Sequence, residues 1–220
     1  MNRKTELSDL IIKAYAHQKN GESSRAITVW NSLLNHQATD KDLKANAHLN
    51  LGHLHQLEGS DELAIQSMSS AIKANLNSSE AYYCLAYMAQ EKQSFEKAVE
   101  YFEKALTLNN TDSGAYNNLG NCYDQLNQTV KAISACTQAI AIDNQYIAAI
   151  YNRGNIYMKT NERQLALKDL TLVLELDSNF YQTYYNRGTL LAQLGCLEQS
   201  KQDLTKAKAL VQTELEQKTH

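Results

Sequence analysis

The pattern of small and apolar positions along the chain repeats every 34 residues. Two series of small residues keep this spacing: Gly52, Ala86, Gly120, Gly154 and Gly188, and Ala64, Ala98, Ala132, Ala166 and Ser200. A fixed period of this length is typical of a solenoid built from helix-turn-helix units, each of which buries its apolar face against its neighbours. We number the positions within each unit so that the glycine series is position 8. Five units then begin at Ala45, Ser79, Ser113, Ile147 and Tyr181.

A further unit begins at Leu7, because Gly21 aligns with Gly59 when the spacing is lengthened to 38 residues. The four extra residues fall near residues 39–42, where we expect a lengthened next helix that is capped by Thr39 with Asp42 as the reciprocal partner. Six units with two helices each predict twelve helices.

Within each unit, small and aromatic residues lie four and three positions apart, as in Tyr116, Gly120 and Tyr123. This spacing puts them on one face of a helix. Glycine within a helix costs about 1 kcal/mol relative to alanine, so its repetition predicts a partner helix that approaches too closely for a larger side chain. The turn at position 15 holds residues that tolerate a left-handed backbone, with Gln93 as the exception: Gly21, Gly59, Gln93, Asn127, Asn161 and Gly195.

This register resembles the tetratricopeptide repeat (TPR) family. The resemblance rests on the two small-residue series, on the position-4 aromatics Tyr82, Tyr116 and Tyr184, and on the position-11 tyrosines Tyr123 and Tyr157. It implies an all-α fold, a right-handed α-α superhelix of six repeats. We expect one array over residues 7–214, a flexible N-terminus at 1–6 and a C-terminal tail at 215–220.

The last unit differs from the others on the side that would face a following repeat. Positions 21 and 28 are apolar in earlier units, as in Ile133 and Ile140, but they are Lys201 and Lys208 here. A polar outer face is typical of a terminal repeat. We therefore expect the last helix to act as a cap that ends the array.

Arginine and aspartate occur together at two positions of the repeat. Arg153 and Arg187 occupy position 7 only in the two units where position 23 is an acid, Asp169 or Asp203. The other units from Ala45 onward have leucine at position 7 and no acid at position 23. The pattern predicts an ion pair between the two helices of each of these units.

Composition narrows the range of functions. The net charge of −3 offers no basic surface for nucleic acid, and no apolar run is long enough to span a membrane. No secretory signal is visible, so we expect a cytoplasmic protein. The four cysteines lack metal or redox spacing and are interpreted as reduced thiols.

The sequence lacks the common enzymatic motifs. It contains no glycine-rich phosphate loop and no nucleophile elbow, so we expect no catalysis and no cofactor. His48 and His55 occupy positions where other units place packed tyrosines, which favours core histidines over metal ligands. His53 is expected to point toward the groove instead, and no Cys-His spacing supports zinc.

By resemblance to the family, the first helices line an extended concave groove through positions 2, 5, 6, 9, 12 and 13. Positions 5, 6 and 9 are rich in asparagine and tyrosine, and the candidate peptide-binding residues are Asn50, His53, Tyr83, Tyr87, Asn117, Asn118, Asn121, Tyr151, Asn152, Asn155, Tyr185 and Asn186. An asparagine offers donors and an acceptor together, so a row of them can bind successive peptide groups. Tyrosines add contact area at low entropy cost.

The asparagine row resembles that of the TPR superhelix in O-GlcNAc transferases, which grips peptide backbone. A purely structural role for the same asparagines stands beside this interpretation. The family members that clamp the acidic C-terminus of heat-shock chaperones use Lys and Arg in the groove, and positions 2 and 5 have neither here. That class of partner is disfavoured.

These features predict a non-catalytic scaffold that binds a protein or peptide segment, as a monomer or a weak homodimer. A subunit that recognises substrate for, or regulates, an enzyme on another chain is an alternative. An envelope assembly factor or a secreted effector is another, and either would need a targeting signal. An apolar patch near the N-terminus, with Ile11, Ile12 and Tyr15 near Leu49, is a candidate contact for a partner helix or a second copy.

Overall fold

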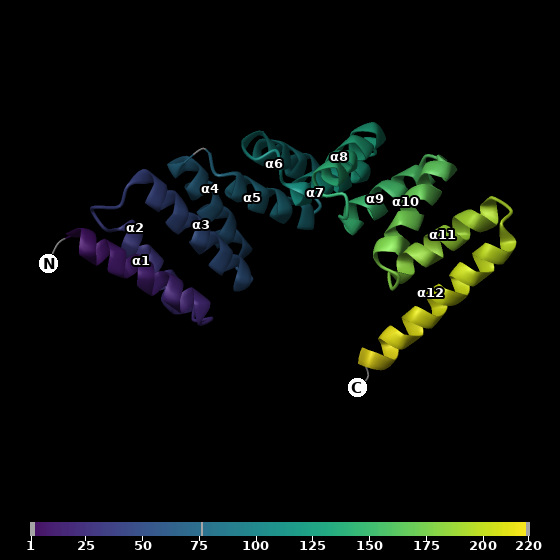
Figure 1. The fold of residues 1–220 in the computed structure, drawn as a ribbon. Coiled ribbons are helices and arrows are strands. Elements are labelled where there is room, and N and C mark those ends of the chain that lie inside the picture. Colours follow the sequence, from purple (N-terminus) through teal and green to yellow (C-terminus); the bar gives the residue numbers. More distant parts are fainter. Residues whose placement is uncertain (1–2, 76, 219–220) are drawn as a thin grey trace. The chain divides into compact units, whose positions relative to one another are not determined.

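The computed structural model describes residues 3–75 and 77–218, and these residues form twelve α-helices and no strand (Figure 1). The helices are α1 (Arg3–Lys19), α2 (Ser23–Leu34), α3 (Lys41–Leu57), α4 (Asp61–Ala74), α5 (Ser79–Glu91), α6 (Phe95–Leu108), α7 (Ser113–Gln125), α8 (Thr129–Ile142), α9 (Ile147–Lys159), α10 (Arg163–Leu176), α11 (Tyr181–Gln193) and α12 (Leu197–Lys218). The predicted all-α array of helix pairs is confirmed.

The helices form two compact units, Met1–Asn110 and Thr111–His220. In the first unit, α1 packs on α2, α3 on α4 and α5 on α6, and α2 and α4 also pack on the helix that follows them. The second unit repeats this order from α7 to α12. Each odd-numbered helix is therefore the first helix of a repeat, and each even-numbered helix is the second.

The ends of the chain are more helical than we expected. Residues 3–6 belong to α1, and α12 continues through residues 215–218. The remaining parts of the two predicted tails, residues 1–2 and 219–220, lie outside the described residues.

The turns between paired helices use the left-handed backbone predicted at position 15. The angle φ is positive at Gly21, Gly59, Gln93, Asn127, Asn161 and Gly195. Gln93 adopts a φ of 55° although its side chain disfavours this conformation. The repeat geometry therefore overrides the local preference of glutamine.

The cap at the start of α3 was predicted at the wrong residue. The extra residues of this junction do lengthen α3 to 17 residues. However, Asp40 is the N-cap, and its Oδ1 accepts a hydrogen bond from the Leu43 amide at 2.8 Å. Thr39 is buried, and its hydroxyl donates instead to the carbonyl oxygen of Leu33 at 2.7 Å. Thr39 thus connects the junction to α2, while the carboxylate of Asp40, which is the stronger hydrogen-bond acceptor, caps α3.

Close packing explains the glycine series. A Cβ added to Gly120 would lie 2.7 Å from Cys136 Sγ, and one added to Gly188 would lie 3.0 Å from Leu204 Cγ. These distances are shorter than the van der Waals contact between such atoms. The predicted close approach of the second helix is confirmed at both positions.

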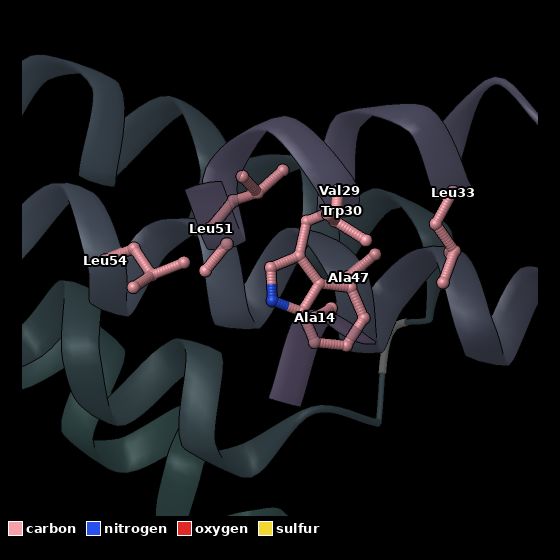
Figure 2. Packing of buried hydrophobic residues seen from close by; sticks show 8 residues of the cluster. Ala14, Val29, Trp30, Leu33, Ala47, Leu51 and Leu54 are labelled. Carbon is pink, nitrogen blue, oxygen red and sulfur yellow. The ribbon is translucent and has the colours of Figure 1, made fainter. Parts of the chain in front are cut away.

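The core of the first unit includes a cluster around a single tryptophan (Figure 2). Trp30 is fully buried, with Ala14, Leu33, Ala47 and Leu51 in the same cluster. The Tyr15 ring meets Trp30 edge-on at 5.1 Å between centroids. This cluster joins α1, α2 and α3.

Both predicted arginine-aspartate pairs are present in the second unit. Arg153 Nε and Nη2 donate to the two carboxylate oxygens of Asp169 at 2.8 and 2.9 Å. Arg187 binds Asp203 in the same way, at 2.7 and 2.9 Å. Both aspartates are buried, and the hydrogen bonds to Asp169 raise the pKa of Arg153. Such bidentate pairs fix the two helices of a repeat in one geometry.

Three of the four cysteines lie in the core. Burial raises the pKa of Cys84 to about 12, of Cys122 to about 11 and of Cys136 to about 12. Cys196, in contrast, is exposed.

We expect only Cys196 to react quickly with a thiol reagent in the folded protein. At pH 8, a thiol with a pKa near 12 is a thiolate for only about one molecule in ten thousand. Titration with a chromogenic disulfide should therefore give one fast thiol per chain and three that react only after denaturation. The Cys196→Ser variant keeps only the three buried thiols. If these reacted rapidly in the absence of denaturant, the assignment would be contradicted.

Candidate functional site

The candidate site is the face of the first helices that the sequence marked as rich in asparagine and tyrosine. We call it the first-helix face and define it by positions 2, 5, 6, 9, 12 and 13 of each repeat. Because the chain divides into two compact units, we describe this face in each of them in turn.

In the second unit, asparagines at position 6 bind the preceding repeat. Asn152 Nδ2 donates to Asn117 Oδ1 at 2.8 Å, and Asn186 Nδ2 donates to Asn155 Oδ1 at 2.8 Å and to the hydroxyl of Tyr151 at 3.1 Å. These bonds link α9 to α7 and α11 to α9. Much of the asparagine row therefore holds neighbouring first helices together.

Three of these five side chains line a polar pocket of about 410 Å³, which we call the amide pocket. Asn121, Asn152, Asn155 and Asn186 belong to its wall, so four of the twelve predicted residues come together here. The pocket also contains an ion pair between Lys159 Nζ and Asp124. Because these two charges are opposite and the other lining residues are uncharged, the wall has no excess of either charge.

Not every predicted residue of this unit faces the pocket. Asn117 is only 5% exposed, because it packs between helices and accepts the bond from Asn152. Asn118 is partly buried. Tyr185 is 60% exposed and, together with Tyr151, lines a second hollow beside α12.

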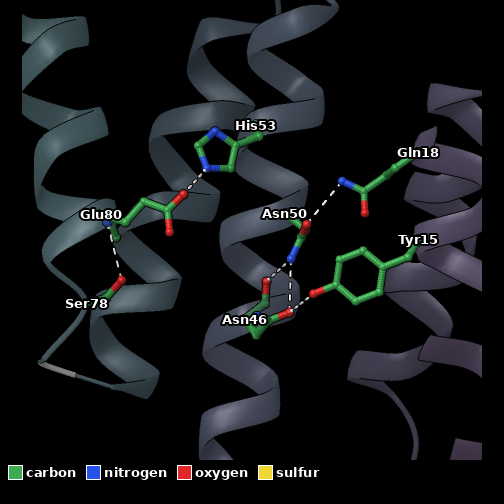
Figure 3. Close-up of polar contacts among 8 residues, drawn as sticks. Tyr15, Gln18, Asn46, Asn50, His53, Ser78 and Glu80 are labelled. Carbon is green, nitrogen blue, oxygen red and sulfur yellow. Dashed lines mark hydrogen bonds and ion pairs between the residues drawn. The ribbon is translucent and has the colours of Figure 1, made fainter. Parts of the chain in front are cut away.

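In the first unit, the first-helix face carries a polar network (Figure 3), and a hydrogen bond to Trp30 connects this network to the core. Gln18 Nε2 donates to Asn50 Oδ1 at 3.1 Å, and Gln18 Oε1 accepts from the Trp30 indole at 2.9 Å. Asn50 Nδ2 donates to Asn46 Oδ1 at 3.0 Å, and Asn46 Oδ1 accepts from the Tyr15 hydroxyl at 3.1 Å. The Asn50 side chain is thus used to join α1 and α3.

His53 lies on the same face and contacts Glu80 of α5, with 3.1 Å between His53 Nε2 and Glu80 Oε1 (Figure 3). The hydrogen bond from His53 lowers the pKa of Glu80. Tyr87 is 38% exposed, whereas the Tyr83 ring packs edge-on against Phe102 at 5.7 Å between centroids. The Tyr83 ring therefore contacts the second helix α6, whereas His53 reaches the next first helix, α5.

The other two histidines of α3 are more enclosed. Burial, followed by the nearby Lys44, lowers the pKa of His48. His55 Nδ1 is buried and has no hydrogen-bond partner among the described residues. In residues 3–75 and 77–218, no three His, Cys, Asp or Glu side chains gather as metal ligands.

Sequence reasoning missed several residues of the face. Asp124 and Lys159 occupy positions 12 and 13, which were assigned to the face but not considered for charge. Gln18 and Asn46 were missed because they lie outside positions 5, 6 and 9, from which the candidates were drawn. Reading every position of the face would have found all four.

Three models of the tetratricopeptide repeat match consecutive parts of the chain. The matches cover residues 113–146, residues 79–112, and residues 147–180 and 181–210. A comparison with curated protein sequences finds no significant match.

Solved structures with the same fold include three with informative descriptions. A structure of MamA is 22% identical over 76% of this chain and 97% of its own, with a TM-score of 0.72. YrrB, described as a TPR protein with an unusual peptide-binding site, is 21% identical over 82% of this chain and 91% of its own, with a TM-score of 0.71. PilF of Pseudomonas aeruginosa is 16% identical over 94% of this chain and 93% of its own, with a TM-score of 0.76.

These structural similarities establish the fold alone, because the identities are low. The family matches go further, since together they cover more than half of the sequence. Proteins of this repeat family are generally non-catalytic interaction modules. Within the described residues, no helix has both the length and the apolar character that a membrane span requires. The chain is a member of the tetratricopeptide repeat family.

Proposed function

We propose that this protein is a non-catalytic interaction scaffold that holds an extended peptide segment against the first-helix face of its second unit. The amide pocket carries the proposal, since it gathers Asn121, Asn152, Asn155 and Asn186 on three consecutive first helices. Side-chain amides have the donors and acceptor of a peptide group, so they can replace the water that an extended backbone loses on binding.

The hydrogen bonds within the face support this role as well as a structural one. Asn152 donates one of its two side-chain N–H groups to Asn117. This bond fixes the rotamer of Asn152 without using all of its hydrogen-bonding groups. Side chains that are already held in place lose little entropy when a ligand binds. The network thus organises the amide pocket in advance.

The charge of the pocket favours an uncharged segment. Lys159 and Asp124 are paired with each other, so neither charge draws a strongly acidic or basic ligand. YrrB gives independent support, because a protein of the same fold is described as having a peptide-binding site.

Peptides selected from a random phage-displayed library on the full chain should bind the amide pocket. For the best selected peptide, the double variant Asn121→Ala/Asn155→Ala is expected to raise Kd about thirtyfold, because two hydrogen bonds contribute on the order of 1 kcal/mol each. Isothermal titration calorimetry gives the Kd values, and circular dichroism checks that the variant is folded.

Val130→Ala is the matched control, since Val130 lies on the second helix α8 and is 83% exposed. Its Kd should equal that of the unaltered chain. Equal binding of the selected peptides by a folded double variant would overturn the proposed site.

A further inference from the structure

One core position of the repeat is exposed only in the last repeat. Position 24 of the second helix is 0% exposed in five repeats and 37% exposed in the sixth: Trp30, Met68, Phe102, Cys136 and Leu170 against Leu204. In the second unit, α9 packs on α8 and α11 packs on α10, beside Cys136 and Leu170. No described helix takes the corresponding place beside Leu204.

A groove of about 650 Å³ lies at this place between α11 and α12, and we call it the terminal groove. It is lined by Tyr151, Tyr181, Gln182, Tyr185, Asn186, Leu204, Ala207, Lys208, Val211 and Gln212. Only one of these side chains is charged. The polar cap that we expected from Lys201 and Lys208 therefore borders an apolar surface and does not replace it.

The helix α12 is longer than its repeat requires. It has 22 residues, whereas α4, α6, α8 and α10 have 14 each. Leu197, Leu204 and Val211 follow one another at intervals of seven, and Leu215 comes four residues later. All four are more than a third exposed. This spacing makes an apolar stripe about 27 Å long on one face of α12, interrupted by Lys201 and Lys208.

Between Glu198 in the first turn of α12 and Lys218 at its end, the charges beside this stripe change from basic to acidic along the helix. Lys201 and Lys208 lie in its first two thirds, and Glu214 and Glu216 follow near its end. When two such helices run in opposite directions, the lysines of one approach the glutamates of the other. A self-complementary surface of this kind is what a two-fold symmetric contact needs.

We propose that the terminal groove is a dimer interface whose occupant is α12 of a second copy of this chain. The two α12 helices lie antiparallel about a two-fold axis, and each covers the Leu204 of the other. The stripe supplies the apolar contact, and the change of charge sets the direction. The terminal groove shares Asn186 with the amide pocket, but Asn121 and Asn155, which the peptide experiment changes, lie outside it, so the two proposals are tested separately.

Sedimentation equilibrium of the full chain, from micromolar to millimolar concentration, tests the proposal. The unaltered chain should dimerise, and Val211→Glu should raise the dimer dissociation constant at least tenfold, because each dimer then buries two carboxylates. Val211 suits this purpose because it is 36% exposed in a single copy. Val130→Glu, which changes an exposed valine on α8, is the matched control and should leave the dimer unchanged.

Charge reversal tests the direction of the contact and the identity of the helix. Two double variants, Lys201→Glu/Lys208→Glu and Glu214→Lys/Glu216→Lys, reverse these charges. Each should weaken self-association about threefold to tenfold, because every exposed ion pair occurs twice in a two-fold symmetric dimer. An equimolar mixture of the two variants should associate at least as well as the unaltered chain. A monomer at every concentration, or a dimer that neither Val211→Glu nor the charge reversals affect, would overturn the proposal.

Discussion

Replacing Arg153 by leucine is expected to lower the free energy of unfolding of the second unit by about 3 to 5 kcal/mol. The carboxylate of Asp169, 3% exposed, would lose both of its bonds to the guanidinium and remain buried without a compensating charge. The same guanidinium donates to Thr137 of the preceding second helix at 3.1 Å, so a contact between repeats is lost as well. Denaturation by urea, followed by circular dichroism, measures the change.

The chain contains its own control for this experiment. The preceding repeat has Leu119 and Ala135 at the same two positions, and both are buried. The double variant Arg153→Leu/Asp169→Ala should therefore recover most of the lost stability, because it removes the buried charge together with its partner. If the single variant were as stable as the unaltered chain, the ion pair would have no role in holding the repeat together.

Replacing Trp30 by alanine is expected to lower the free energy of unfolding of the first unit by about 3 to 5 kcal/mol. Trp30 is fully buried among residues of α1, α2 and α3 (Figure 2). Its indole N–H donates to Gln18, which in turn donates to Asn50. The substitution leaves a cavity and removes the anchor of the polar network. Hydrogen exchange measured by mass spectrometry should show the largest loss of protection in α1–α3.

Repeat proteins make this loss local, because each repeat is stabilised by its own contacts and those with its neighbours. We therefore expect protection in α9–α12 to stay within error of the unaltered chain. Trp30→Phe, which keeps an aromatic ring but not the N–H donor, should lose about half as much stability. Equal loss of protection along the whole chain would show that stability is not organised by repeats.

Much of the architecture follows from the sequence because the residues that make each contact recur at the same positions in several repeats. The pairing of Arg153 with Asp169 was predictable, since Arg187 and Asp203 recur at the same positions while the other repeats lack both charges. The glycine positions were predictable for the same reason. A single instance of either pattern would have had many explanations.

Features that occur only once were harder to predict. The cap at Asp40 was assigned to Thr39 because both residues suit a helix start, and the choice depends on the Leu33 carbonyl that Thr39 reaches in space. The length of α12 was also missed, because its last turns have no counterpart in the other repeats.

The candidate site was predicted in part. Position in the repeat correctly placed Asn121, Asn152 and Asn155 on one face, and the structure adds the pocket that joins them. Position in the repeat could not show that Asn117 turns inward to accept the bond from Asn152, because the exposure of Asn117 depends on how the next helix packs. The division of the asparagines between structural and outward-facing roles is a tertiary property.

The most direct test of the central claim is site-specific photo-cross-linking of a selected peptide to the folded chain. A photoreactive amino acid is placed at position 121 in the amide pocket or, as the control, at position 130 on α8. We predict cross-links from position 121 that excess unlabelled peptide abolishes, and none from position 130. Cross-links from position 130 alone would contradict peptide binding by the first-helix face.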